Sequence, residues 1–138
     1  MRLFFVLCCA VLIGSAALAA ANAARDAILT NLHAQAKAAD PGFTGFSAPR
    51  GATFYAATHS GGKPDTPSCT TCHSLAPHQP GKTRAGKDIA PMAVSKAPDR
   101  YTDPDKVEKW FQRNCQSVLG RECTAVEKGD FLTFMISQ

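Results

Sequence analysis

Apolar side chains recur at helical spacing in the first third of the chain. Between residues 25 and 39 they fall on one face, at Ile28, Leu32, Ala36 and Ala39. A spacing of three to four residues is typical of an amphipathic helix. Asp40-Pro41-Gly42 is a turn signal that ends this helix, and residues 42–45 are expected to form a loop.

A second helix is predicted to begin at Ser47 and to run to about residue 58. Ser47 is suited to cap its first turn, and Pro49 is tolerated there because its missing N–H would be unpaired anyway. Residues 60–68 are rich in glycine and proline, and residues 74–100 contain four prolines without a sustained period. Both stretches are therefore expected to be loops, the second wrapped around the haem with room for one short helical turn.

The C-terminal third of the chain predicts a third helix that starts near residue 102. Thr102 is suited to be its N-cap, with acidic residues in the first turn. Val107, Trp110 and Phe111 then form a stripe that is expected to face the core. Asn114 continues this stripe with an amide, which would need a polar partner if it were buried.

A fourth helix is predicted to follow a chain break at Gly120. Thr124 and Glu127 have the spacing of a capping box at its start. Its apolar side chains are Phe131, Leu132, Phe134, Met135 and Ile136. Because no segment shows the alternation of a strand, the sequence predicts an all-α fold.

The N-terminus has the pattern of a secretory signal peptide over residues 1–23. Arg2 is followed by an apolar run, residues 3–13, that is too short to span a bilayer. The expected cleavage site is Ala21-Asn22-Ala23, with Ala17-Leu18-Ala19 as second choice and an uncleaved anchor as the alternative. Cleavage would leave residues 24–47 as an N-terminal helix and loop, and residues 48–138 as the main domain.

The segment Cys69-Thr70-Thr71-Cys72-His73 is a C-x-x-C-H motif, which predicts covalent attachment of a c-type haem. Two intervening residues let the thiols of Cys69 and Cys72 reach the same porphyrin edge, and His73 is then the proximal iron ligand. A zinc site would need a second pair of ligands at similar spacing. A thioredoxin-like site would need a βαβ pattern. Neither companion pattern is present, so we favour a single haem c.

The chain has six cysteines, and two of them, Cys8 and Cys9, are expected to leave with the signal peptide. With Cys69 and Cys72 bound to haem, one pair remains. Disulfides form in oxidising, exported compartments, so Cys115 and Cys123 are predicted to be bonded. Two unpaired buried thiols are the alternative.

The charge of the chain is mild and excludes an argument for nucleic-acid binding. The formal net charge is +4 and falls to about +3 without Arg2. A basic rim beside the haem motif could face an acidic redox partner, although scattered solvated lysines are the alternative. The residues of this rim are Lys63, Lys82, Arg84, Lys87 and Lys96.

The distal ligand of the iron stays open when residue spacing alone is considered. Met92 follows the haem motif in a proline-rich loop and ranks first, Asn114 second, and an open site third. The structural alternative for Asn114 is a C-terminal helix cap. His33, His59, His78 and Met135 are less suited to this role.

Gly51-x-x-Phe54 and an aromatic in the last helix resemble the class I cytochrome c arrangement. There, the first core helix crosses the last one, and a glycine allows close contact with an aromatic, here Phe134. This resemblance implies a class I cytochrome c-like fold around one covalent haem, with an extra N-terminal helix.

Six stretches together resemble the SHP cytochromes c, the sphaeroides haem protein family. They are GGKPDTPSCTTCH (61–73), GKDIAP (86–91), PDRYTD (98–103), VEKW (107–110), RNC (113–115) and GRECT (120–124). The resemblance implies His73 as proximal ligand, Asn114 as distal ligand, and a disulfide between Cys115 and Cys123. The position of Met92 is a loop residue in that family.

With these ligands and the signal pattern, the chain is expected to be an exported, periplasmic electron carrier. An amide is a weak, hard donor that suits ferrous iron poorly, so reduction should release Asn114. The ferrous haem would then bind oxygen or another small diatomic ligand. Expected partners are dihaem c-type or membrane b-type cytochromes, with no nucleic acid and no membrane attachment after signal cleavage. A haem enzyme acting on oxygen, nitric oxide or peroxide, which could use Arg100 or Arg113, and a plain Met92-ligated carrier are the alternatives.

Overall fold

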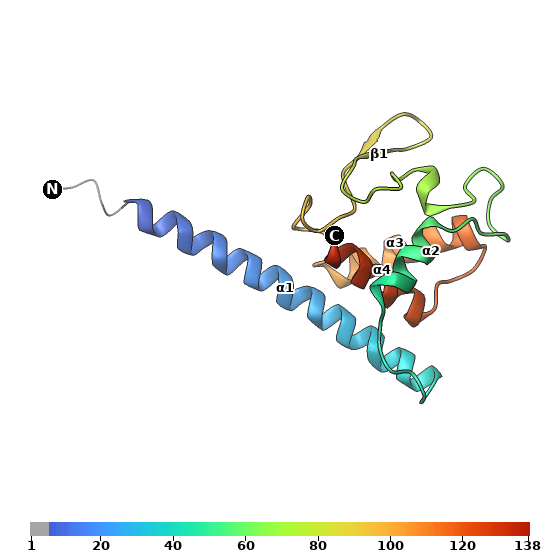
Figure 1. Cartoon of the computed structure of the whole chain (residues 1–138), viewed down its shortest axis with the longest axis horizontal. Coiled ribbons are helices and arrows are strands. Elements are labelled where there is room, and N and C mark those ends of the chain that lie inside the picture. The colour runs from blue at the N-terminus through green and yellow to red at the C-terminus, as the bar shows by residue number, and fades with distance from the viewer. Residues whose placement is uncertain (1–5) are drawn as a thin grey trace.

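The computed structural model describes the backbone of residues 6–138 and the side chains from residue 14 onward. Arg2 and the start of the predicted signal peptide lie outside the described residues, as do the side chains of Cys8 and Cys9. The elements in chain order are α1 (Val6–Ala39), α2 (Ala48–Ala56), the 3-10 turn η1 (Cys69–Thr71), β1 (Gly81–Lys82), β2 (Asp88–Ile89), α3 (Pro104–Leu119) and α4 (Ala125–Ser137). Figure 1 shows α1 extending away from the other elements.

The fold is helical, as predicted, but the segment expected to be loop with at most a short helical turn contains two short strands. There β1 and β2 pair antiparallel, with Gly81 opposite Ile89. Gly86 in the connecting turn has a φ of 79°, a conformation that glycine adopts without strain. Strands of two residues are too short to display an alternating pattern, which is why the sequence does not reveal them.

Helix α1 buries side chains against the rest of the molecule along its C-terminal half. Residues 14–20 are exposed, whereas Ile28, Leu32 and Ala36 are buried on the predicted face. Ala39 is exposed, and the helix ends there, at the predicted position. Within the described residues, none of the helices combines the length and the apolar character that a membrane span requires.

Helix α2 begins as its caps predict and crosses α4 at close range. The Ser47 side chain accepts a hydrogen bond from the backbone N–H of Arg50, and α2 ends at Ala56, two residues earlier than expected. A Cβ added to Gly51 would lie 2.0 Å from the carbonyl oxygen of Asp130 and 2.9 Å from Cβ of Phe134. The predicted contact between Gly51 and Phe134 is therefore confirmed.

An ion pair closes the α2–α4 crossing on its polar side. The carboxylate of Asp130, which is 4% exposed, accepts hydrogen bonds from the Ser47 backbone N–H at 2.6 Å and from the Arg50 guanidinium at 2.7 and 2.8 Å. A buried carboxylate is tolerated only when its oxygens are satisfied in this way. The core that surrounds the crossing includes the fully buried side chains of Tyr55, Leu132 and Met135.

Helix α3 departs from the sequence prediction at its cap and in its buried face. Its N-cap is Asp103, which accepts from the Lys106 N–H at 3.1 Å, whereas the Thr102 hydroxyl donates to an upstream carbonyl. Proline is favoured at the first helical position, so Pro104 sets the start and makes the residue before it the cap.

The core-facing stripe of α3 is narrower than predicted. Val107 and Phe111 pack against the core, whereas Trp110 is 46% exposed and Asn114 is also exposed. The buried face instead turns toward Cys115, Val118 and Leu119. Helical spacing identifies the side chains that share one face of the helix, but it does not show which part of that face will pack against the core.

Candidate haem-binding site

The C-x-x-C-H motif is folded into one tight turn, in which the backbone N–H groups of Cys72 and His73 both donate to the Cys69 carbonyl. The Ser68 hydroxyl accepts from the Thr70 N–H at 3.2 Å, and the Thr71 hydroxyl accepts from the Ser68 N–H at 3.3 Å. This reciprocal capping box starts η1, and Cys72 follows as its C-cap. Neither cysteine of the motif takes part in the disulfide, so both are available for thioether bonds.

The first thiol of the motif is held in an apolar setting. Cys69 packs against the core cluster that contains Tyr55 and Met135, and burial raises the pKa of its thiol to about 11. Burial disfavours the thiolate, so this thiol stays protonated at neutral pH. A protonated thiol beside apolar side chains suits contact with the apolar edge of a porphyrin.

The imidazole of His73 has the environment of a metal ligand. Burial, followed by the nearby charge of Arg100, lowers the pKa of His73, and its Nδ1 is buried without a hydrogen-bond partner in residues 6–138. Low pKa favours the neutral ring, the form that binds metals. A buried ring nitrogen without a partner is rare in folded proteins and calls for an explanation. A ring that binds iron when the haem is attached is consistent with this observation.

Two neighbouring elements fix the backbone around His73. The Lys82 N–H in β1 donates to the Cys72 carbonyl at 2.8 Å, and a Cβ on Gly81 would lie 2.2 Å from the same oxygen. On the other side, the Tyr55 hydroxyl of α2 donates to the Ser74 carbonyl at 2.5 Å. Burial raises the pKa of Tyr55 to about 12, so this donor keeps its proton. The residues at this turn fit a covalently held haem.

Asn114 lies in the interior of α3, and not at its end. The C-cap of α3 is Gly120, whose φ is 70°. The helix-cap alternative for Asn114 is therefore wrong, because capping requires a position at the terminus. The Asn114 amide is exposed and forms no hydrogen bond with any residue that the structure describes. It is thus free to act as a ligand.

Met92, the rival distal ligand, is a buried member of the core. Its side chain is 8% exposed and clusters with Ile28, Leu32 and Met135. Its backbone N–H donates to the Pro77 carbonyl at 2.9 Å, and this bond fixes the loop that carries it.

The three histidines outside the motif occupy ordinary settings. His33 packs against the rings of Phe43 and Phe46 at 5.3 and 6.1 Å. A ring nitrogen of His59 lies 3.1 Å from the Phe54 carbonyl oxygen, and His78 is exposed. Within residues 6–138, no group of three or more His, Cys, Asp and Glu side chains could hold a metal ion.

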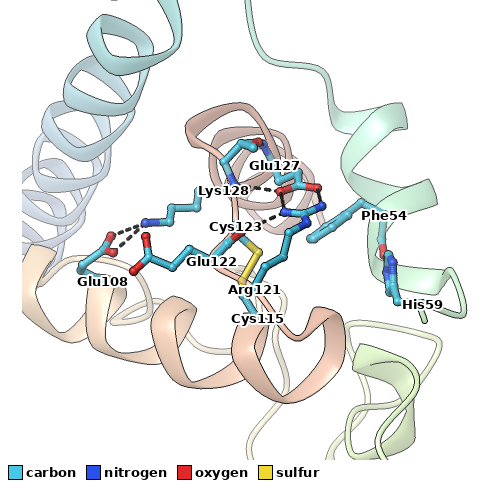
Figure 2. The surroundings of a disulfide bond; sticks show 10 residues. Phe54, His59, Glu108, Cys115, Arg121, Glu122, Cys123, Glu127 and Lys128 are labelled. Atoms are coloured by element: carbon cyan, nitrogen blue, oxygen red, sulfur yellow. Dashed lines mark hydrogen bonds and ion pairs between the residues drawn. A yellow bond between two sulfur atoms is a disulfide. The ribbon is translucent and has the colours of Figure 1, made fainter. Parts of the chain in front are cut away.

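The predicted disulfide between Cys115 and Cys123 is present and begins one residue after Asn114. Figure 2 shows it joining α3 to the segment that leads into α4. Each cysteine is 6% exposed, and Val118 and Leu119 complete its buried cluster. The bond therefore ties the end of α3 that follows Asn114 to the start of α4.

The predicted basic rim is partly neutralised. Arg84 pairs with Asp65, and Lys82 lies 3.5 Å from a carboxylate oxygen of Asp88. Exposed pairs of this kind contribute little to stability, but they reduce the net charge that a partner would meet.

Comparison with known proteins decides the family. Residues 41–135 match the family described as a domain of unknown function (DUF1924). Cytochrome c-type protein SHP of Cereibacter sphaeroides is 55% identical over 91 residues, which are 66% of this chain and 70% of that protein. The chain belongs to the SHP cytochrome c family.

Solved structures place this SHP-family protein among helical cytochromes. The structure of oxidised SHP, an oxygen binding cytochrome c, matches with a TM-score of 0.76 at 46% identity, over 83% of this chain and 96% of that one. Oxidised cytochrome c'' of Methylophilus methylotrophus matches with a TM-score of 0.71 at 28% identity, over 84% and 95% of the two chains. The predicted cytochrome fold is confirmed.

Several residues around the site were not found by sequence reasoning. Arg25 is 4% exposed, although arginine side chains are usually exposed to solvent. Tyr101 adopts a positive φ that no sequence pattern indicated. The only available signal was the Pro98-Asp99-Arg100 turn, which precedes Tyr101.

Proposed function

We propose that this SHP-family protein is an exported, single-haem electron carrier whose distal position opens on reduction. Cys69 and Cys72 would hold the haem covalently, and His73 would be the proximal ligand. When bound, haem c supplies an iron that exchanges one electron and can take a small diatomic ligand on an open face. The relative SHP is an oxygen binding cytochrome c, which supports oxygen as one such ligand.

The observation that carries the proposal is the contrast between Asn114 and Met92. Asn114 presents an exposed amide in mid-helix without a hydrogen-bond partner, whereas Met92 is packed in the core. An amide is a hard, weak donor that tolerates ferric iron and suits ferrous iron poorly. Asn114 is therefore expected to leave when the iron is reduced, while the adjacent disulfide holds the helix.

Export to the periplasm is supported by the signal-peptide pattern and by the disulfide, a bond typical of oxidising compartments. An electron donor of the dihaem c-type or membrane b-type cytochrome class is the partner that the family resemblance implies. The catalytic alternative finds less support, because Arg100 already donates to two backbone carbonyls and Arg113 stacks 5.5 Å from the Trp110 ring.

Ligand exchange in two oxidation states tests the role of Asn114. In the ferric protein, cyanide must displace Asn114, so Asn114→Ala should raise the apparent cyanide affinity about tenfold or more. In the ferrous protein the amide has already left, so carbon monoxide affinity should be the same with and without it. Both titrations are read from the haem absorption spectrum.

Gln112→Ala is the matched control, because it removes an exposed amide from the same helix. It should change neither titration. A ferric Asn114→Ala protein with unchanged cyanide affinity would show that Asn114 is not the distal ligand.

A further inference from the structure

Tyr101 has a strained backbone that the surrounding structure must hold in place. Its φ is 62°, and it is the only described residue other than glycine with a positive φ. A bulky side chain in this region is a true outlier, and such strain persists only where neighbours fix it.

Helices α1 and α4 clamp the turn that carries Tyr101. The buried Arg25 of α1 donates through Nε to the Arg100 carbonyl at 2.9 Å and through Nη2 to the Pro98 carbonyl. The Tyr101 ring meets the Phe131 ring of α4 edge to face, with centroids 6.2 Å apart. Both sides of the strained residue are thus anchored.

The clamped turn donates hydrogen bonds to three consecutive carbonyls of the loop that carries Met92. Arg100 donates through Nη2 to Ala90 at 2.7 Å and through Nε to Pro91 at 2.6 Å. The Tyr101 hydroxyl donates to the Met92 carbonyl at 3.0 Å and lies 4.0 Å from the Met92 sulfur. The strained backbone of Tyr101 therefore delivers its hydroxyl to both polar groups of Met92.

We propose that Arg25, Arg100 and Tyr101 form a brace that keeps the Met92 sulfur away from the haem iron. The brace makes these three residues positioning residues, and its effect is to leave the distal side to Asn114. This inference rests on the proposed function, since it concerns which side chain binds the same iron.

The chemistry of the two side chains gives the brace its importance. A thioether is a soft ligand that stabilises ferrous iron, whereas an amide is a hard ligand that does not. A released Met92 would therefore bind best in the ferrous state, which is the state that the protein must keep open. A brace that acts on the loop backbone prevents this competition without altering Asn114.

Variants of the brace should convert part of the ferrous protein into a methionine-ligated form. Tyr101→Phe removes one oxygen atom and keeps the ring on Phe131, and Arg100→Met removes the other two hydrogen bonds. In the exported, haem-loaded double variant we expect a low-spin ferrous fraction, because the released Met92 sulfur binds ferrous iron while Asn114 keeps the ferric iron. If Met92 occupies about nine-tenths of the iron, apparent carbon monoxide affinity falls about tenfold.

Two further variants separate ligation from loss of structure. Adding Met92→Leu to the double variant should restore the open ferrous spectrum and the carbon monoxide affinity, because leucine cannot bind iron. Thr133→Val also removes a half-buried hydroxyl that donates to a carbonyl, and it should leave the ferrous spectrum and the carbon monoxide affinity unchanged. A general loosening of the fold would not be reversed by Met92→Leu.

The inference and the proposed function fail in different ways. If ferric wild-type protein already shows the red charge-transfer band of iron–methionine sulfur, Asn114 is not the ligand and the proposed function is wrong. If wild-type protein opens on reduction but Tyr101→Phe and the double variant keep its ferrous spectrum and carbon monoxide affinity, the brace is wrong and the function stands.

Discussion

At the scale of single residues, burial makes the haem-attachment turn an apolar setting that disfavours charge. It shifts two groups of the turn toward their uncharged forms, lowering the pKa of His73 and raising that of Cys69. An apolar, uncharged turn is suited to pack against a porphyrin. The Tyr55 hydroxyl and the Lys82 N–H hold this turn by donating to the backbone carbonyls of Ser74 and Cys72.

Glu127 should give the fold a pH dependence in mild acid. Hydrogen bonds from Arg121, and then from the Thr124 N–H, hold the pKa of the Glu127 carboxyl below its usual value. Because the folded-state pKa is depressed, ionised Glu127 stabilises the fold at pH values above its unfolded pKa of about 4.3. This stabilisation is lost as the pH falls through the pKa of Glu127 in the folded state.

Glu127→Gln should therefore lower the free energy of unfolding by up to about 1 kcal/mol at neutral pH, since the pair is partly solvated. Urea titrations at neutral pH and at about pH 3 measure the difference, which should shrink in acid. Glu122→Gln, which removes an exposed carboxylate nearby, is the control and should have little effect at either pH. A difference that is independent of pH would contradict the account.

At the scale of elements, the crossing of α2 and α4 sets the frame for the haem turn. Gly51 should not tolerate a side chain, because an added Cβ meets the backbone oxygen of Asp130 at 2.0 Å. Gly51→Ala is expected to destabilise the protein by about 3 kcal/mol, the upper range for overpacking. Gly42→Ala is the control, since its Cβ meets only the Asp40 side chain, at 3.2 Å. Equal unfolding midpoints in urea for the two variants would contradict the close crossing.

The disulfide at the end of α3 should stabilise both the fold and the position of Asn114. Removing it with Cys115→Ala and Cys123→Ala is expected to cost about 2–3 kcal/mol, because a short loop is no longer closed in the unfolded chain. Ferric cyanide binding should also become faster, since the helix after Asn114 is less firmly held. Urea unfolding and stopped-flow absorption measure the two effects, and unchanged cyanide kinetics would separate the disulfide from ligand control.

The same elements show what the sequence could and could not predict. Capping residues placed the starts of α2 and α4, and the Gly51 pattern found the crossing with Phe134, because these signals are local. The exposed side of α3 was mispredicted, since spacing defines a stripe but not the partner that covers it. The brace was missed because Arg25 and Arg100 are 75 residues apart, and only the tertiary fold joins them.

At the scale of the whole molecule, α1 is continuous, but its side chains change from exposed to buried near the predicted cleavage site. Residues 14–20 are exposed, and tight contact begins at Arg25, which holds the turn at residues 98–100. The exported protein is therefore expected to begin at Ala24 and to keep Arg25, whose hydrogen bonds hold α1 against this turn. Intact-mass spectrometry should give residues 24–138 with one haem and one disulfide. A chain that starts after Arg25 would contradict this, because it would lack the hydrogen bonds of Arg25 to residues 98–100.

The central claim is that reduction opens the distal position by releasing Asn114. The most direct measurement is the absorption spectrum of the exported, dithionite-reduced protein, with and without carbon monoxide. The account predicts a high-spin ferrous spectrum that shifts when carbon monoxide is added. A low-spin ferrous spectrum that is indifferent to carbon monoxide would contradict it and would make the protein a plain electron carrier with Met92 on the iron.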